Sequence, residues 1–252
     1  AIPMSRIDDA VRRILLVKKK YGLFDRPFAD KSLLVHVGSD EHRELARDAV
    51  RKSLVLLKNT NQLLPLKKAG LKITVAGKGA DNLGMQLGGW SISWQGDMGY
   101  TTPGTTILEA VKATVADSNL VQYSVNGSDA TGDVAIVVVG EEPYAEMKGD
   151  RDELSLNQSD LDVISTIQAK DIPVIVVLIS GRPMLITDQL PQWDALLAAW
   201  LPGTEGQGIA DVLFGDYSPT GKLSFAWPRS MDQLPFTDEN DHLFEIGYGL
   251  HY

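Results

Sequence analysis

The sequence contains no cysteine among its 252 residues. Disulfide bonds, thiol catalysis and cysteine metal sites are therefore excluded, although the cellular compartment stays open because secreted proteins also do without cysteine. Histidine is scarce too. The four histidines, His36, His42, His242 and His251, show no ligand spacing such as HExxH. We therefore expect no metal ion and no cofactor.

Positive charge and long apolar runs are also in short supply. Lys and Arg total 24 against 33 Asp and Glu, a formal charge of −9, and no basic cluster is large enough to hold a phosphate backbone. No stretch reaches the eighteen or so apolar residues that a membrane helix requires. With 44% hydrophobic and 23% charged residues, the composition is that of a globular protein. We expect neither a nucleic-acid partner nor a membrane span.

Short apolar runs alternate with helical patterns over most of the chain. Helical spacing occurs near 106–115, 159–169 and 206–214, and apolar runs of strand length occur at 73–76, 120–125, 134–139, 174–179, 195–200 and 223–226. Runs that are apolar on both faces and separated by helices are typical of a parallel sheet covered by helices. The pattern predicts the α/β class, a three-layer α/β/α sandwich with a mainly parallel sheet.

The chain opens on a helical pattern of its own. Residues 5–21 carry one apolar stripe, with Ser5 available as the N-cap, lysines in the last turn and Gly22 at the end. Residues 23–39 have few periodic signals and are typical of a linker. A second helix follows, capped by Ser39 or Asp40. Because the first helix begins abruptly and needs a surface to pack on, we expect an earlier part of the molecule before it.

Two long irregular segments fall where an open parallel sheet binds ligands, beyond the carboxyl ends of its strands. We call residues 84–104 the tryptophan loop and residues 140–154 the acidic loop. The acidic loop directly follows the apolar run at 134–139. Loops of this length inside a compact domain are typical of functional sites or of disorder, and the tryptophans favour order.

The acidic loop sets six carboxylates against two cations, Lys148 and Arg151; the acids are Glu141, Glu142, Glu146, Asp150, Asp152 and Glu153. Carboxylates crowded in a partly dry site repel one another, so the pKa of at least one rises and that group can donate a proton near neutral pH. The alternative is a solvated acidic loop without chemistry. The residues taken alone favour that alternative.

The tryptophan loop presents Trp90 directly after two glycines. An indole on a tight glycine turn offers a flat apolar surface with one donor nitrogen, which suits the apolar face of a sugar ring. The other interpretation is that the indole closes the top of the core. For Trp90 the two interpretations are equally supported, and for Trp94 the core plug is favoured.

Eight motifs follow one another in the order known from one enzyme family. The motifs are RIDDAVRRIL (6–15), GLFD (22–25), SLVLLKN (53–59), GGW (88–90) with WQG (94–96), GE (140–141) with PYAEMKGD (143–150), SGRP (180–183), PGTEG (202–206) and GDYSPTGKL (215–223). Together they resemble the carboxyl-terminal part of glycoside hydrolase family 3, and they look most like its β-glucosidase and β-glucan exohydrolase branch.

The resemblance implies a division of the chain. In that family a (β/α)8 barrel comes first and supplies an aspartate nucleophile, and an α/β sandwich follows and supplies the acid/base glutamate. Residues 1–22 would then be the last helix of a barrel that is otherwise absent, 23–39 the linker, and 40–252 the sandwich. A barrel takes about 250 residues, so we expect the amino-terminal barrel and its nucleophile on a missing segment or a separate chain.

The resemblance also implies site residues and an activity. It places the general acid/base on Glu146 and the sugar-stacking indole on Trp90. The expected function is a retaining, exo-acting β-glucosidase or β-glucan glucohydrolase, secreted or periplasmic, whose substrates are β-glucosides or β-glucan oligosaccharides. The alternative is a non-catalytic α/β module that binds carbohydrate or stabilises a partner.

Four neighbours of Glu146 need geometry to interpret. Glu141 and Glu142 lie close enough in sequence to compete for the acid role. Lys148 would favour the ionised carboxylate if it were close, so we expect its ammonium group to point away from Glu146. Arg151 stands where close relatives carry asparagine, which leaves the contacts of the outer part of the loop open.

Overall fold

The computed structural model describes residues 2–236 and 241–252, and the chain divides into two compact units, Ala1–His42 and Arg43–Tyr252. The boundary falls inside helix α2 (Asp40–Ser53). The first unit contains α1 (Met4–Lys20) and a 3-10 helix, η1 (Lys31–His36), which lies within the segment expected to be a linker. None of the described helices is both long and apolar enough to cross a membrane.

The two predicted helix caps have different outcomes. The cap at Ser5 is wrong: α1 begins at Met4 after Pro3, without a side-chain cap, because the chain enters the helix through the proline and Ser5 already lies in the first turn. At α2 the Ser39 hydroxyl accepts the His42 N–H at 3.4 Å, so Ser39 acts as the cap.

The second unit is built on one six-stranded sheet of order β1-β6-β5-β4-β2-β3. All neighbouring strands are parallel except β1, which runs antiparallel to β6 at one edge. The predicted α/β class with a mainly parallel sheet is therefore confirmed. The strands are β1 (Val55–Asn59), β2 (Ile73–Ala76), β3 (Val121–Ser124), β4 (Val134–Gly140), β5 (Val174–Ile179) and β6 (Ala195–Trp200).

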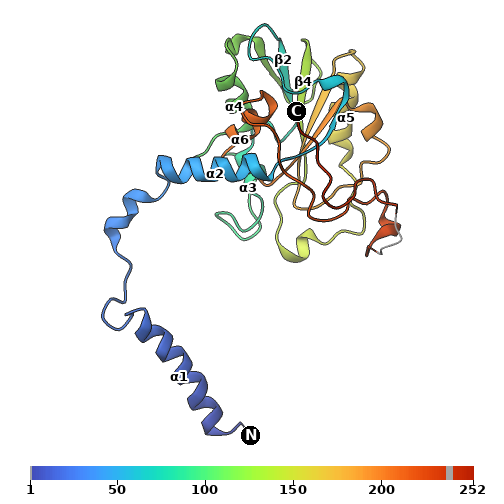
Figure 1. The fold of residues 1–252 in the computed structure, drawn as a ribbon. Helices are drawn as coiled ribbons and strands as arrows, with labels where there is room; N and C mark the ends of the chain where they lie inside the picture. The colour runs from blue at the N-terminus through green and yellow to red at the C-terminus, as the bar shows by residue number, and fades with distance from the viewer. Residues whose placement is uncertain (1, 237–240) are drawn as a thin grey trace. The chain divides into compact units, whose positions relative to one another are not determined.

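Helices cover both faces of this sheet, and side chains alternate between two cores. Ile136 and Val138 of β4 enter a core shared with α4 and α6, whereas Val137 and Val139 enter a core shared with α5. Figure 1 shows these helices on opposite sides of the sheet. This is the predicted three-layer arrangement. The remaining helices are α3 (Leu83–Leu87), α4 (Ile107–Thr114), α5 (Gln158–Gln168), α6 (Gln207–Leu213), η2 (Thr60–Gln62), η3 (Ser118–Leu120), η4 (Glu146–Gly149), η5 (Leu190–Gln192) and η6 (Met231–Gln233).

The run at 223–226 is not a strand, so that prediction is wrong. The sheet edge beside β6 is already occupied by β1, and this run instead exchanges hydrogen bonds with the end of the chain. Leu223 donates to Tyr248, and Gly247 donates to Leu223. The segment closes one core with Trp227, which is fully buried and donates its indole N–H to the Met184 carbonyl at 2.8 Å.

The acidic loop leaves the sheet at the point where the strand order reverses. The chain passes from β2 outward to β3, and from β4 in the other direction to β5 and β6. Such a switch point is where open α/β sheets bind ligands, beyond the carboxyl ends of the strands. Gly140 ends β4 at a φ of 135°, and a Cβ there would overlap the Ile179 carbonyl of β5. Only glycine fits this exit.

Candidate functional site

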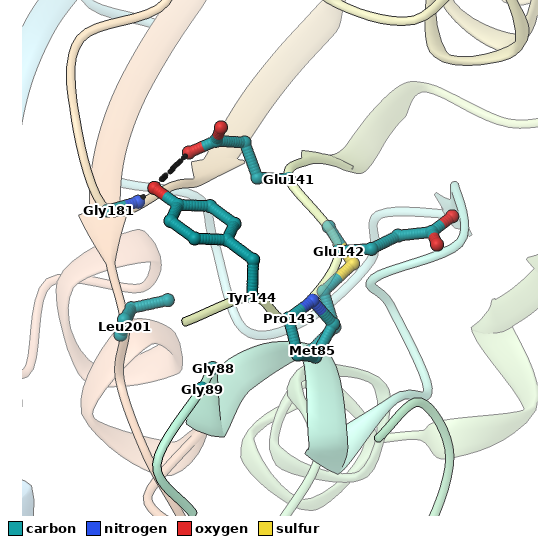
Figure 2. Close-up of a pocket in the computed structure, with 9 residues that line it drawn as sticks. All are labelled: Met85, Gly88, Gly89, Glu141, Glu142, Pro143, Tyr144, Gly181 and Leu201. Atoms are coloured by element: carbon teal, nitrogen blue, oxygen red, sulfur yellow. Dashed lines mark hydrogen bonds between the residues drawn. The ribbon is translucent and has the colours of Figure 1, made fainter. Parts of the chain in front are cut away.

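Glu141, the second residue of the acidic loop, is a buried and fully bound carboxylate. Its Oε1 accepts hydrogen bonds from Arg182 Nε at 3.0 Å and Nη2 at 2.7 Å. Its Oε2 accepts the Tyr144 hydroxyl at 3.0 Å and the Gly181 N–H at 3.3 Å, and Figure 2 shows this side of the arrangement. We call Glu141, Tyr144, Arg182 and Gly181 the Glu141 clamp. Because both oxygens are engaged, Glu141 anchors the loop rather than offering a free acid.

Tyr144 completes the clamp with a hydroxyl that stays protonated. Burial raises its pKa to about 12, and the nearby Glu141 charge adds to this shift. The Arg182 guanidinium lies over its ring, 4.7 Å from the centroid, a cation–π arrangement that also neutralises Glu141. The phenol is therefore a hydrogen-bond donor throughout the pH range in which proteins work.

Glu142 points to a different cation. It is exposed, and its carboxylate lies 3.8 Å from the Lys78 ammonium. Lys78 pairs more closely, at 3.2 Å, with the buried Asp160, which also accepts the Gly140 N–H at 3.3 Å. Burial raises the pKa of Asp160, while Lys78 opposes that shift. The Lys78–Asp160 pair thus fixes the end of β4, and Glu142 lies at its solvent edge.

Glu146 begins the 3-10 turn η4 and is exposed on the described chain. Its φ of 50° is unfavourable for a residue with a side chain, so the surroundings must hold it there. Residue Ala145 before it is buried and donates its N–H to Gln95 of the tryptophan loop at 3.0 Å. Among the described residues no ion pair joins Lys148 to Glu146, and the orientation of the Lys148 ammonium group stays a prediction.

Trp90 and Trp94 both lie on the surface of the described chain, with 68% and 47% of their area exposed. Trp90 has a φ of 59°, and its backbone N–H donates to the backbone carbonyl of Trp94 at 2.9 Å. The two indoles are 6.3 Å apart and tilted by 50°. The core plug predicted for Trp94 is wrong, because nearly half of this side chain is exposed.

The tryptophan loop and the acidic loop are packed against each other at the positions next to the predicted site residues. A Cβ at Gly89 would overlap the Tyr144 carbonyl oxygen, so Trp90 follows directly on a point of contact between the loops. Gln95 and Ala145 form the second contact, directly before Glu146. Between the loops lies a hollow of about 200 Å³, lined by Met85, Gly88, Gly89, Glu141, Glu142, Pro143, Tyr144, Gly181 and Leu201 (Figure 2).

Two structural residues of this region carry no clear signal in the sequence. Gln86 is buried and donates to the Thr105 and Gly203 carbonyls at 3.2 and 3.0 Å, while its carbonyl accepts the Ile107 N–H. It fastens the base of the tryptophan loop. Arg182 belongs to the SGRP motif, but only the folded chain brings it to Glu141, which lies 41 positions earlier.

Arg151 contacts both the start of the acidic loop and the residue that follows its end. It donates to the Ser155 carbonyl at 3.1 Å, and its Nη1 lies 3.6 Å from the Glu141 carboxylate. The contacts of Arg151, which the sequence left open, therefore connect the two ends of the acidic loop. Within the described part of the chain no group of three or more metal-binding side chains lies close enough to hold an ion.

Comparison with known proteins places this arrangement in a family. Residues 54–252 match the model of the glycosyl hydrolase family 3 C-terminal domain. The chain belongs to this family. The motifs that carried the resemblance lie largely in the matched range, and the family 3 domain contains both loops.

Relatives of this family 3 domain are glycosidases that are much longer than the chain. An exo-1,3/1,4-β-glucanase from a Pseudoalteromonas species is 43% identical with a TM-score of 0.92, and the match covers 100% of this chain and 34% of that one. A periplasmic β-glucosidase of Salmonella typhimurium is 31% identical, over 100% of this chain and 41% of the relative. A lysosomal β-glucosidase of Dictyostelium discoideum is 30% identical, over 100% and 35%. The chain thus spans less than half of each.

The Glu141 clamp predicts an order of stability effects. Arg182→Ala leaves a buried carboxylate without its main cation, so we expect a loss near the lower end of about 3–5 kcal/mol, because Tyr144 and Gly181 still donate. Arg151→Ala removes only a 3.6 Å contact from Glu141, with an expected loss of about 1 kcal/mol or less. Urea unfolding of the two variants measures both. Equal losses would contradict the assignment of Arg182 as the principal partner.

Proposed function

We propose that this family 3 domain supplies the general acid/base and part of the sugar-binding cleft of a retaining, exo-acting β-glucosidase or β-glucan glucohydrolase. The observation that supports this most is the packing of the two loops, which presents Glu146 and Trp90 from adjacent backbone contacts at the carboxyl ends of the strands. A proton donor next to an exposed indole suits the cleavage of a sugar linkage.

The proposed acid is Glu146 rather than its two neighbours in the loop. Glu141 has both oxygens occupied by the clamp. Glu142 lies 3.8 Å from the Lys78 ammonium. Glu146 makes no ion pair among the described residues and is exposed, so its carboxyl group is available to a substrate and to the second body that closes the cleft.

The mechanism requires a second carboxylate that we place on an amino-terminal (β/α)8 barrel. In a retaining glycosidase an ionised nucleophile attacks the anomeric carbon, while the acid protonates the departing oxygen; water then releases the sugar with the same residue acting as base. The two carboxyl groups lie about 5–5.5 Å apart. The mechanism therefore needs an ionised aspartate and a glutamic acid at position 146 that carries the proton.

The division of the chain follows from the same proposal. Residues 1–22 would belong to the barrel as its last helix, 23–39 would be the linker, and 40–252 would form the sandwich. The side chains of α1 are not buried within the described chain, and its stripe of apolar residues suits a helix that packs on other barrel elements.

The proposed substrates are β-glucosides and β-glucan oligosaccharides. An exo-1,3/1,4-β-glucanase and two β-glucosidases among the relatives support this class. A secreted or periplasmic location is proposed because one of these relatives is a periplasmic enzyme. A non-catalytic carbohydrate-binding module is the second candidate, favoured by the two indoles that the chain exposes by itself.

Replacing the acid tests this function. In the complete enzyme, this chain together with its barrel, Glu146→Gln should lower kcat/KM for cellobiose by about 10²–10⁴. A dinitrophenyl β-glucoside should keep most of its kcat/KM, since that leaving group departs without a proton.

The matched control is Glu142→Gln, which replaces an exposed glutamate of the same loop and should leave kcat/KM unchanged for both substrates. A second measurement uses Glu146→Ala with added azide, which should restore turnover of the activated glucoside by taking over the attack on the glycosyl-enzyme. Normal cleavage of cellobiose by Glu146→Gln would refute the assignment of the acid to this residue.

The sugar platform gives a separate prediction. Trp90→Ala removes the indole expected to lie against the sugar, a contact worth about 0.5–1.5 kcal/mol, or roughly a threefold to tenfold rise in KM for short β-glucans. Trp94→Ala should have a smaller effect, because this indole supports Trp90 from the side. Steady-state kinetics of both variants of the complete enzyme measure the difference. The platform role would be refuted by equal changes in KM.

A further inference from the structure

Tyr144 lies between the fixed start of the acidic loop and the turn that carries Glu146. At the fixed side its hydroxyl donates to Glu141 at 3.0 Å, under the Arg182 guanidinium. A Cβ at Gly181 would come within 2.9 Å of the same hydroxyl, so the loop that follows β5 closes the other side. The phenol is therefore held by groups that are themselves anchored at the ends of β4 and β5.

The ring of Tyr144 supports the turn from inside. Gly149 ends η4, and a Cβ at that position would overlap the Tyr144 ring. The turn of Glu146–Gly149 thus rests on the aromatic face at its far end and begins at Ala145, the residue next to Tyr144. Glu146 keeps a φ of 50°, which persists only where the surroundings determine it.

The backbone of Tyr144 meets the tryptophan loop at the same time. Its carbonyl oxygen occupies the space where a side chain at Gly89 would lie, and Gly89 directly precedes Trp90. The neighbouring Ala145 N–H donates to Gln95 at 3.0 Å. Tyr144 therefore belongs to the clamp and also contacts the turn of Glu146 and the residue before Trp90.

We propose that Tyr144 is a positioning residue that aligns Glu146 with the scissile linkage and with the Trp90 platform. This role rests on the proposed function of Glu146. Its hydroxyl does not itself exchange a proton with the substrate, because it is spent on Glu141. The residue acts by fixing the turn, and small displacements of a catalytic group are costly, on the order of 10²-fold in rate for about 1 Å.

The test separates alignment of the acid from a general weakening of the fold. In the complete enzyme, Tyr144→Phe removes only the bond to Glu141, and kcat/KM is measured with cellobiose and with dinitrophenyl β-glucoside. We expect a loss of roughly ten- to hundredfold for cellobiose, and little change for the activated glucoside, whose leaving group needs no proton. Tyr123→Phe, the same change on β3 outside both loops, should alter neither.

A second variant reaches the same contact from the turn. Gly149→Ala presses a methyl group onto the Tyr144 ring and should produce the same selective loss, even if Tyr144→Phe proves too unstable to assay. Equal losses for both substrates, or no loss, in these variants would overturn the positioning role.

Glu146→Gln measured in parallel keeps the two claims apart. If Glu146→Gln loses kcat/KM for cellobiose but not for dinitrophenyl β-glucoside, while Tyr144→Phe and Gly149→Ala show no such difference, the positioning role alone fails. If Glu146→Gln shows no difference between the two substrates, the proposed function itself fails.

Discussion

The site depends on the hydrogen-bonded ion pair between the buried Glu141 carboxylate and Arg182. A charge removed from water must be paired and hydrogen-bonded, and here Arg182, Tyr144 and the Gly181 N–H together meet that demand. The consequence is geometric. A loop that leaves the sheet after β4 is fastened to the loop that follows β5, and the turn of Glu146 is built on that fastening.

Much of the sheet was predictable from the sequence because β2, β4, β5 and β6 are apolar on both faces and fall in predicted runs. The run at 120–125 also contains a strand, β3, although its Gln122 and Tyr123 are not buried, whereas β1 (Val55–Asn59) lies outside the predicted runs. The run at 223–226 differs from these strands: Ser224 and Phe225 are exposed, and Leu223 pairs with the end of the chain instead of with the sheet. Which runs pair is a tertiary property that local patterns do not contain.

The candidate site was predictable in position but not in its internal division of labour. The loop after β4 and its acids are visible in the sequence, yet Glu141, Glu142 and Glu146 are chemically alike there. Only the folded chain shows that the first is bound by Arg182, the second faces Lys78, and the third is left exposed. Trp94 was misjudged for a related reason: aromatic residues suit cores and platforms equally, and only the folded chain shows that this side chain stays exposed.

In the proposed enzyme the clamp brings one glutamate, at position 146, into a cleft shared with a second carboxylate. A structure of the complete enzyme with glucose bound measures this directly. We expect the carboxyl group of Glu146 to lie about 5–5.5 Å from an aspartate of the barrel, with the Trp90 indole at the edge of the same cleft. A glucose complex in which Glu146 faces bulk solvent, or in which Glu142 takes that place, would contradict it.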